Sequence, residues 1–483
     1  MEKTNPSDYL ILDSHELLEK NIEIKREAQK KVSTDVLRTK IKQYLKKEKR
    51  IKAITVCFTD LEGKFMRLDY DKNFVLESDQ NFTFDGSSIK GFTVQGNSDL
   101  RLMIDWTSFR WLPAEVFGPG KVMVFANVFN KDKTLFPSDF RGQLQQLADE
   151  LYQKEKITIN VSCEIEGILL KGTHAEENFD SKEGLRPATQ SGYFHCLPQD
   201  DLIKFIDRVA EAKRSLGFEN EKDHPEVAPS QFELNYKYAD ILMAADYVQL
   251  YKLICRQIAN KLGCTATFLP KPRMNINGSG MHTNISIFKN GKNIFYDAKG
   301  KYGLSKMAMN FLTAILYYAK DSCLVLNSSV NSYRRLDPKF EAPNEIKMHD
   351  CDRGSMIRIP LGNEKSTRIE VRSVAPDCNP YLTMYTLLAA GMKGINASPK
   401  EAKLYSAVLN KREKLPGNIY DALRYFKQSA FMKEIMTLTN HAKYLSLKER
   451  VSNRSPKDLG TRIKEGEIKY HHEITNQEIW AKY

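Results

Sequence analysis

Apolar and polar residues alternate in several short segments of the chain. This pattern predicts half-buried β-strands, because successive side chains of a strand point to opposite faces. The segments are 157–166, 232–237, 282–287, 356–359 and 367–372. A strand with one face in water explains any one of them alone. Their polar positions, however, hold Glu, His and Arg more than Lys, Thr and Ser. Because Glu and His bind divalent metals and Arg binds phosphate, the set predicts the wall of a metal–nucleotide site.

The order of predicted elements divides the chain into three parts. Residues 1–33 are polar and mildly helical, and we interpret them as an N-terminal extension. Residues 34–140 begin with a helix near 35–47 and continue as a strand-rich segment with Gly and Pro breaks, which predicts a small β domain. Residues 141–483 form a larger α+β region, with helices predicted near 139–154, 199–216, 239–262, 305–320 and 380–392. From Lys400 onward the pattern is helical and polar.

Composition narrows the class of protein. The chain has 483 residues, of which 41% are hydrophobic, and this indicates a folded protein with more than one domain. Its net charge of +12 comes from dispersed Lys, dense only at 41–52 and 448–462, so solvated helix faces explain it better than a nucleic-acid partner. The eight scattered Cys predict reduced, buried thiols. Without a signal peptide or an apolar run of membrane-spanning length, we expect a cytoplasmic protein with no membrane association.

Six motifs carry the candidate chemistry, and they occur in a fixed order. They are FDGSSIKG (84–91), EVAPSQFE (226–233), FLPKPRMNINGSGMH (268–282), NSYRRLDPKFEAP (331–343), RGSMIRIP (353–360) and RIEVRSVAPDCNPYL (368–382). Together they resemble the class I, bacterial-type glutamine synthetases from about Thr34 onward. The resemblance implies an α+β fold: a small N-terminal β-grasp-like domain (34–140), then a large catalytic domain (141–483) with a curved antiparallel sheet flanked by helices. It also implies ATP-dependent ligation of ammonia to L-glutamate through γ-glutamyl phosphate.

The same resemblance implies two or more Mg²⁺ or Mn²⁺ ions in each subunit. One ion is expected on Glu166, Glu226 and Glu233, and the other on Glu164, His282 and Glu370. Mostly oxygen ligands suit these hard cations, whereas zinc would favour more His or Cys. One position departs from the family pattern: Pro225 stands where a second His commonly precedes the metal Glu, which leaves His224 alone.

The resemblance also assigns residues to the substrates. ATP, a co-substrate, is expected to contact Glu221, Asn284, Ser286, Arg353, Arg358, Lys365 and Arg368. It must be held without a P-loop, because the chain has no GxxxxGK[ST] motif. L-glutamate and the ammonium pocket are expected to involve Ser88, Glu166, Tyr193, Asn277, Gly278, Arg335, Arg353 and Arg372. The expected catalytic residues are Asp85, which binds and deprotonates ammonium, Glu341, which closes the site, and Arg353, which holds phosphate.

Assembly and two alternative functions follow from the same family. The resemblance implies a homo-oligomer, a dodecamer of two hexameric rings, in which the loop carrying Asp85 enters the site of a neighbouring subunit. Regulatory protein partners are left open. One alternative is a γ-glutamyl ligase for another amine, such as a polyamine or monoamine; those relatives usually lose the DGSS element, which this chain keeps. The other is a catalytically silent ring scaffold; such relatives tend to lose metal ligands, and all six are present here.

Overall fold

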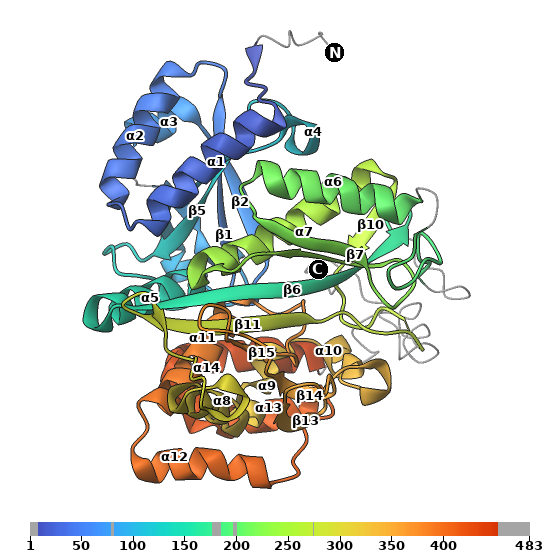
Figure 1. Cartoon of the computed structure of the whole chain (residues 1–483). Helices are drawn as coiled ribbons and strands as arrows, with labels where there is room; N and C mark the ends of the chain where they lie inside the picture. The colour runs from blue at the N-terminus through green and yellow to red at the C-terminus, as the bar shows by residue number, and fades with distance from the viewer. Residues whose placement is uncertain (1–7, 79–81, 176–184, 197–199, 274, 453–483) are drawn as a thin grey trace.

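The computed structural model describes residues 8–78, 82–175, 185–196, 200–273 and 275–452, and it contains two β-sheets (Figure 1). The smaller sheet has five strands in the order β2-β1-β5-β4-β3. Its strands are β1 (Ala53–Thr59), β2 (Phe65–Asp71), β3 (Phe82–Asp85), β4 (Asp99–Trp111) and β5 (Val122–Phe129). The central β1–β5 pair is parallel, and the other pairs are antiparallel.

Helices cover the smaller sheet because each has one apolar face. Helix α2 (Thr34–Lys47) buries Leu37, Ile41 and Leu45, which recur every four residues along one side of the helix. These side chains join the core formed by the strands of the small sheet. Two short helices, α3 (Lys72–Glu77) and α4 (Ala114–Phe117), connect strands.

Residues 8–33 of the predicted N-terminal extension are part of the folded structure. Helix α1 (Ser14–Gln29) starts at a capping box, in which Asp13 accepts from the backbone of Glu16 and the Glu16 side chain accepts from the backbone of Asp13. Asn21 of this helix is completely buried. Its Nδ2 donates to the backbone oxygens of Trp111 (3.0 Å) and Ser215 (2.8 Å). Helix α1 therefore links the small sheet to α6 (Asp201–Ser215), a helix of the second part of the chain.

The larger sheet has ten strands, and its main path runs β13-β14-β15-β11-β6-β8-β7. These strands are β6 (Ile157–Lys171), β7 (Asn220–Pro225), β8 (Gln231–Tyr236), β11 (Met281–Lys289), β13 (Glu345–His349), β14 (Ser355–Arg358) and β15 (Ile369–Val371). Shorter strands pair at the side: β9 (Ala239–Asp240), β10 (Cys264–Thr267) and β12 (Lys292–Asn293). The expected antiparallel sheet is in fact mixed, because β13 and β14 run parallel.

Helices pack on both sides of the long strands β6 and β11. In Figure 1, α6 (Asp201–Ser215) and α7 (Ile241–Lys261) lie above β6, while the helices of the second half of the chain lie below β11. The remaining helices are α5 (Phe140–Glu155), α8 (Lys306–Tyr317), α9 (Ala319–Leu326), α10 (Val330–Arg335), α11 (Pro380–Ile395), α12 (Pro399–Ser406), α13 (Ile419–Gln428) and α14 (Ala430–Ser452). The helical pattern predicted from Lys400 is confirmed as far as Ser452; residues 453–483 lie outside the described residues.

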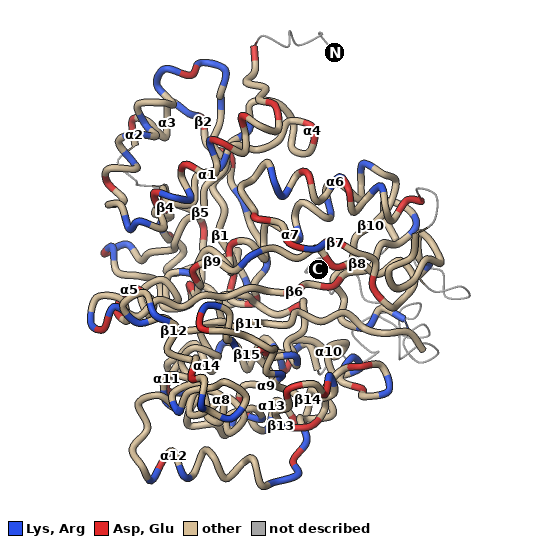
Figure 2. The backbone as a smooth tube through the Cα atoms, in the orientation of Figure 1, with Lys and Arg blue, Asp and Glu red and all other residues tan. Residues whose placement is uncertain are grey.

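Three predictions from composition concern the cysteines, the distribution of charge and membrane-spanning helices. All eight Cys are free, but Cys196 and Cys351 are exposed, so the prediction of buried thiols is wrong for these two. Figure 2 shows Lys and Arg interspersed with Asp and Glu along both halves of the chain. No helix within the described ranges is long and apolar enough to cross a membrane.

Candidate functional site

The five strands predicted from alternation lie next to one another in the large sheet, in the order β14-β15-β11-β6-β8. Their register brings the polar positions together. Glu164 of β6 pairs with His282 of β11, and Glu166 of β6 pairs with Glu233 of β8. On the other edge of β11, Glu370 of β15 lies opposite Asn284. The period-two pattern thus places charged side chains from separate motifs on one continuous patch of sheet.

The first group of potential metal ligands is Glu164, His282 and Glu370, each offering an atom within 4.8 Å of the others. His282 Nδ1 lies 3.3 Å from Glu164 Oε2 and 3.9 Å from Glu370 Oε1. Glu370 is completely buried, and it accepts hydrogen bonds from Arg358 Nε (2.6 Å) and Arg372 Nη1 (2.5 Å). The sequence predicts these three residues as ligands of one ion, and the structure brings them together.

The second group is His224, Glu226 and Glu233, again within 4.8 Å. His224 Nδ1 lies 3.6 Å from Glu226 Oε1, and His224 Nε2 lies 3.6 Å from Glu233 Oε1. Sequence reasoning set His224 aside because of Pro225, although its two-residue spacing from Glu226 on an extended segment would have indicated a shared face. Glu166, expected in this group, pairs with Glu233 in the strand register, and its Oε1 lies 3.9 Å from His282 Nε2 of the first group.

The carboxylates of the site differ in their environments. Burial opposes the charge of Glu164, but its hydrogen bond to His282 and the charge of that ring outweigh burial and lower the pKa of Glu164 to about 2. Burial, followed by the charges of Glu166 and Glu233, raises the pKa of Glu226 to about 7. Burial likewise raises the pKa of Glu166. Like charges crowded in a half-enclosed space favour a bound cation, which would relieve their repulsion.

Glu164 and His282 of the first group, and Glu226 and Glu233 of the second, line a pocket of about 150 Å³; Glu370, a predicted metal ligand, and His224 do not line it. The residues that line it are Glu164, Glu166, Tyr193, Lys222, Glu226, Gln231, Glu233, Asn277, Gly278, His282, Arg335, Phe340, Glu341, Ala342, Arg353, Arg358 and Arg372. Most of the predicted metal and substrate residues are therefore in one place. Carboxylates and guanidinium groups share its wall, so the pocket can hold metal ions and anionic substrates side by side.

One wall of the pocket is built by close approach of the chain to Arg335. Arg335 is 2% exposed, and it donates to the backbone oxygens of Val374 (3.2 Å) and Arg372 (2.9 Å). Burial lowers its pKa to about 10. A Cβ on Gly278 would meet the backbone oxygen of Pro270 at 2.4 Å, so this position has room only for glycine. Nearby, Asn277 Nδ2 donates to Glu341 Oε2 at 3.0 Å, which joins two predicted substrate-site residues.

Several predicted residues do not line this pocket. Asp85 is exposed at the end of β3 in the small sheet, and Ser88 Oγ donates to its Oδ2 at 2.5 Å. The hydrogen bonds from Ser87 and Ser88 lower the pKa of Asp85. The nucleotide positions outside the pocket are Glu221, Asn284, Ser286, Lys365 and Arg368.

Two of these nucleotide positions connect to the metal group by hydrogen bonds. Arg368 Nε donates to Asn284 Oδ1 at 2.9 Å, and Asn284 Nδ2 donates to Glu164 Oε1 at 3.1 Å. On β7 the pocket is lined by Lys222, which sequence reasoning missed, and not by the adjacent Glu221. Lys222, His224 and Glu226 are spaced by two residues, and this spacing predicts that their side chains share one face of an extended segment.

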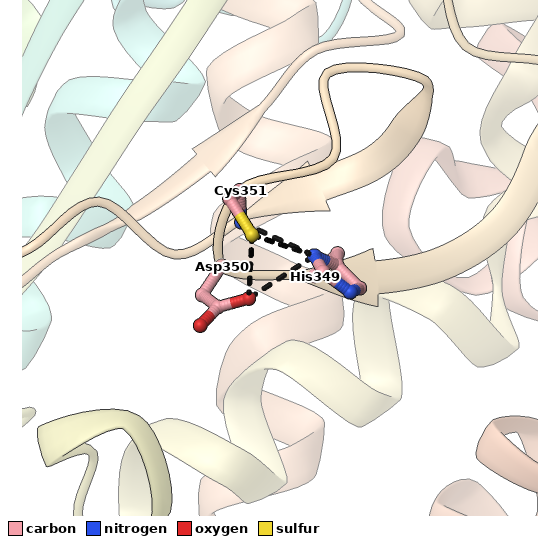
Figure 3. A group of neighbouring side chains, drawn as sticks. All are labelled: His349, Asp350 and Cys351. Atoms are coloured by element: carbon pink, nitrogen blue, oxygen red, sulfur yellow. Dashed lines mark hydrogen bonds and ion pairs between the residues drawn. The ribbon is translucent and has the colours of Figure 1, made fainter.

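A third cluster lies outside the pocket, on the exposed turn after β13 (Figure 3). The side chains of Asp350 and Cys351 both point toward His349. However, His349 Nδ1 already accepts the backbone N–H groups of Cys351 (3.1 Å) and Asp352 (3.0 Å). The nitrogen nearest the sulfur and the carboxylate is therefore occupied in holding the turn, and we assign no ligand to this cluster.

The fold and the pocket together indicate an enzyme with candidate metal ligands beside guanidinium groups, and comparisons with known proteins identify its family. The family model for the glutamine synthetase catalytic domain matches residues 137–459, and that for the glutamine synthetase beta-Grasp domain matches residues 50–131. The glutamine synthetase of Methanosarcina mazei is 36% identical over 417 residues, covering 83% of this chain and 91% of the relative. That of Thermus thermophilus is 35% identical over 421 residues, covering 83% and 92%.

Solved structures agree with this fold. A Plasmodium falciparum glutamine synthetase matches with a TM-score of 0.78 at 22% identity, covering 88% of this chain and 98% of that one. A GmaS structure in complex with ADP matches with a TM-score of 0.72 at 26% identity, covering 86% and 97%. The chain belongs to the glutamine synthetase family. It is an ATP-dependent ligase that joins ammonia to L-glutamate, and its family uses divalent metals.

Proposed function

We propose that the pocket on the large sheet makes L-glutamine through γ-glutamyl phosphate, in the manner of the class I enzymes. The observation that carries this proposal is that carboxylates from both metal-ligand groups line one pocket together with four guanidinium groups. The carboxylates are Glu164, Glu226 and Glu233, and the guanidinium groups belong to Arg335, Arg353, Arg358 and Arg372. A side-chain oxygen of glutamate attacks the γ-phosphorus of ATP and ADP leaves. The nitrogen of ammonia then attacks the acyl carbon, inorganic phosphate leaves, and a base removes the extra proton.

The donor atoms of the two groups fit Mg²⁺ or Mn²⁺. Each group offers two carboxylates and one imidazole, a mostly oxygen set that suits hard cations. We assign one ion to Glu164, His282 and Glu370, and a second to Glu226 and Glu233 with Glu166 or His224 as the third ligand. When bound, these ions would neutralise the charge of the phosphates and polarise the phosphoryl group.

The chain's own cations complete the phosphate site. Arg353 and Arg358 line the pocket, and the guanidinium group presents a planar fork of donors that matches phosphate oxygens. Arg358 is aimed by its hydrogen bond to the buried Glu370, so this carboxylate both belongs to the metal group and positions a phosphate-binding residue. Arg335 and Arg372, which are almost fully buried, are placed to bind the glutamate carboxylates. Fixed donors of this kind stabilise developing charge without reorganisation.

The proposed ammonium site is incomplete in a single subunit, because Asp85 lies away from the pocket. Asp85 lies on the edge strand of the small sheet and does not line the pocket. We propose that it acts in the pocket of a neighbouring subunit, in a homo-oligomer that we expect to be a dodecamer of two rings. Glu341, hydrogen-bonded to Asn277, would then close the site over the acyl phosphate and keep water from it.

A second candidate function is ligation of an organic amine to glutamate. The observation that favours this second function is the structural similarity to GmaS, at 26% identity. The retained Asp85 and Ser88, joined by a hydrogen bond, favour ammonia instead, because a carboxylate beside a hydroxyl offers oxygen acceptors to the N–H groups of ammonium. The two functions share every step up to the acyl phosphate and differ only in the nucleophile.

An assay with competing amines separates these functions. Purified enzyme with ATP, Mg²⁺ and L-glutamate should release phosphate far faster with ammonium than with methylamine or putrescine, compared as kcat/KM. The amide product is identified by mass spectrometry. Equal or better turnover of an organic amine would assign the chain to the alternative ligases, and the absence of turnover with every amine would favour the silent scaffold.

A direct count of bound metal tests the ligand assignment without relying on turnover. Titration with Mn²⁺, followed by electron paramagnetic resonance, should give at least two sites for each subunit. Glu370→Ala should remove one of them, while Glu434→Ala, an exposed glutamate of α14 that pairs with Lys393, should remove none. Unchanged stoichiometry in Glu370→Ala would contradict the assignment.

A further inference from the structure

Lys271 is a buried cation next to the segment that carries Glu341. It is 3% exposed and does not line the catalytic pocket. Asn331 of α10, which is completely buried, holds its backbone in place. The Lys271 N–H donates to Asn331 Oδ1 at 2.6 Å, and Asn331 Nδ2 donates to the Lys271 carbonyl oxygen at 2.7 Å. The Lys271 side chain therefore extends from a fixed point of the catalytic domain.

The ammonium group of Lys271 joins two segments of the pocket wall. Its Nζ donates to the backbone oxygen of Ile276 and lies 3.6 Å from the centre of the Phe340 ring. Asn277 follows Ile276 in the chain, and Glu341 follows Phe340. Asn277 Nδ2 donates to Glu341 Oε2 at 3.0 Å. The cation thus contacts the residue before each member of this hydrogen-bonded pair.

No carboxylate pairs directly with this buried charge. Within the described ranges Lys271 forms no ion pair. Burial lowers its pKa to about 8, and the charge of Asp337 acts in the opposite direction without offsetting burial. A buried ammonium group is costly unless other groups stabilise it. The carbonyl oxygen of Ile276 and the face of the Phe340 ring supply that stabilisation, and a cation–π contact is strongest where water is excluded.

Glu341 depends on contacts from outside its own segment. Its backbone φ is 60°, a left-handed conformation that is unfavourable for a residue with a Cβ. The residues before it, Pro338–Phe340, form a single short turn of 3-10 helix, and the Glu341 side chain is exposed. A turn of this length has little stability of its own. Its position over the pocket must therefore be fixed by neighbours such as Asn277 and Lys271.

We propose that Lys271 is a positioning residue, which holds Ile276 and Phe340 together and thereby keeps Glu341 over the catalytic pocket. The inference rests on the proposed function, in which Glu341 keeps water from the acyl phosphate. Without the ammonium group of Lys271, the segment should open more often and admit water. Attack by water on γ-glutamyl phosphate regenerates glutamate and releases inorganic phosphate, so ATP is hydrolysed and no amide forms.

The ratio of phosphate released to amide formed measures this loss. With ATP, Mg²⁺, L-glutamate and limiting ammonium, the unaltered enzyme should release about one phosphate for each amide. Lys271→Met removes the charge, keeps a side chain of similar length, and should raise the excess of phosphate roughly tenfold. Phe340→Leu removes the ring and should have a similar effect. The double variant should be no worse than either single variant, because both changes break the same contact.

A matched control lies in the same segment. Lys339→Met removes an exposed cation next to Phe340 that does not line the pocket, and it should leave the ratio unchanged. Trypsin then measures the position of the segment without relying on turnover. Cleavage after the exposed Lys339 requires the segment to open, so Lys271→Met should speed this cleavage by roughly the same tenfold factor. The fragments are identified by mass spectrometry, and Lys339→Met should lack them.

Three results would overturn the proposal. If Lys271→Met lowers turnover but leaves the phosphate-to-amide ratio unchanged, the residue has only a structural role. If the effects of the single variants multiply in the double variant, Lys271 and Phe340 act independently. If the unaltered enzyme forms no amide, the proposed function fails, and an unchanged rate of tryptic cleavage in Lys271→Met would then refute this inference separately. Phe340 is partly exposed, so Phe340→Leu keeps both measurements valid even if Lys271→Met fails to fold.

Discussion

Replacing Gly280 by Ala should damage catalysis while leaving the fold intact. Gly280 lies just before β11, and its backbone N–H donates to Glu166 Oε2 at 2.7 Å. A Cβ at this position would lie 2.5 Å from Arg335 Nη2 and 2.8 Å from His282 Nε2. One methyl group would thus press at once on Arg335, which we propose binds substrate, and on His282, a proposed metal ligand. The backbone φ of Gly280 is not positive, so alanine itself is not strained there.

The size of the effect follows from these distances. Ordinary contact begins near 3.4 Å, so the guanidinium must move by about 0.9 Å. Arg335 is held by two backbone oxygens and is almost fully buried, so it has little freedom to move without losing a hydrogen bond. A displacement of about 1 Å in a catalytic site costs on the order of 100-fold, or about 2.7 kcal/mol of activation free energy. Overpacking should lower the free energy of unfolding by about 1–3 kcal/mol.

The assay compares kcat/KM and urea unfolding for three proteins. Gly417→Ala is the matched control, because a Cβ on Gly417 meets nothing within 4 Å and its φ is not positive. We expect a loss of roughly 100-fold in kcat/KM for Gly280→Ala and near-normal values for Gly417→Ala. Activity of Gly280→Ala within about threefold of the unaltered enzyme would show that neither Arg335 nor His282 needs its present position, which refutes the reasoning.

Three further predictions concern single features of the structure. Asn21→Ala should lower the free energy of unfolding by about 3 kcal/mol, measured in urea, because it removes three buried hydrogen bonds worth about 1 kcal/mol each; no change would show that helix α1 does not hold the domains together. His224→Gln should weaken Mn²⁺ binding without loss of secondary structure by circular dichroism, and unchanged binding would exclude His224 as a ligand. Inactive Asp85→Ala and Glu370→Ala subunits, co-expressed, should regain some activity; mixed oligomers that stay inactive would place the whole site within one chain.

The strands that carry the site were predictable because each has one apolar and one polar face. The period-two pattern predicted β6, β8, β11, β14 and β15. It did not predict the order of these strands in the sheet, because each segment was interpreted by itself. Strand β7 was missed because its sequence, NEKDHP, has no alternating apolar face. Its pairing with β8 is also irregular between Asn220 and Asp223. Lys222 and His224 do follow the two-residue spacing of a strand, but without an alternating apolar face this spacing did not predict one.

Contacts between distant segments were not predictable by any local pattern. The approach of Gly280 to Arg335 depends on how the loop before β11 packs against α10, and no periodicity encodes that distance. The docking of α1 depends on Asn21, which is completely buried. Asn is usually exposed, so the sequence did not predict this residue in an interface. Helical tendency was readable in residues 1–33, but the hydrogen bonds to Trp111 and Ser215 that fix the helix in place were not.

The environment of Asp85 bears on how the last chemical step works. In a single subunit this carboxylate is exposed and accepts hydrogen bonds from Ser87 and Ser88, which lower its pKa. A carboxylate of this kind is ionised at neutral pH and attracts ammonium, but it is a weak base. Removing a proton from ammonium requires a stronger base, so if Asp85 is that base, as we propose, its pKa must rise between binding and transfer. Burial raises the pKa of a carboxylate, and the pocket of a neighbouring subunit closed by Glu341 would supply it. Assembly would then both complete the site and activate its base.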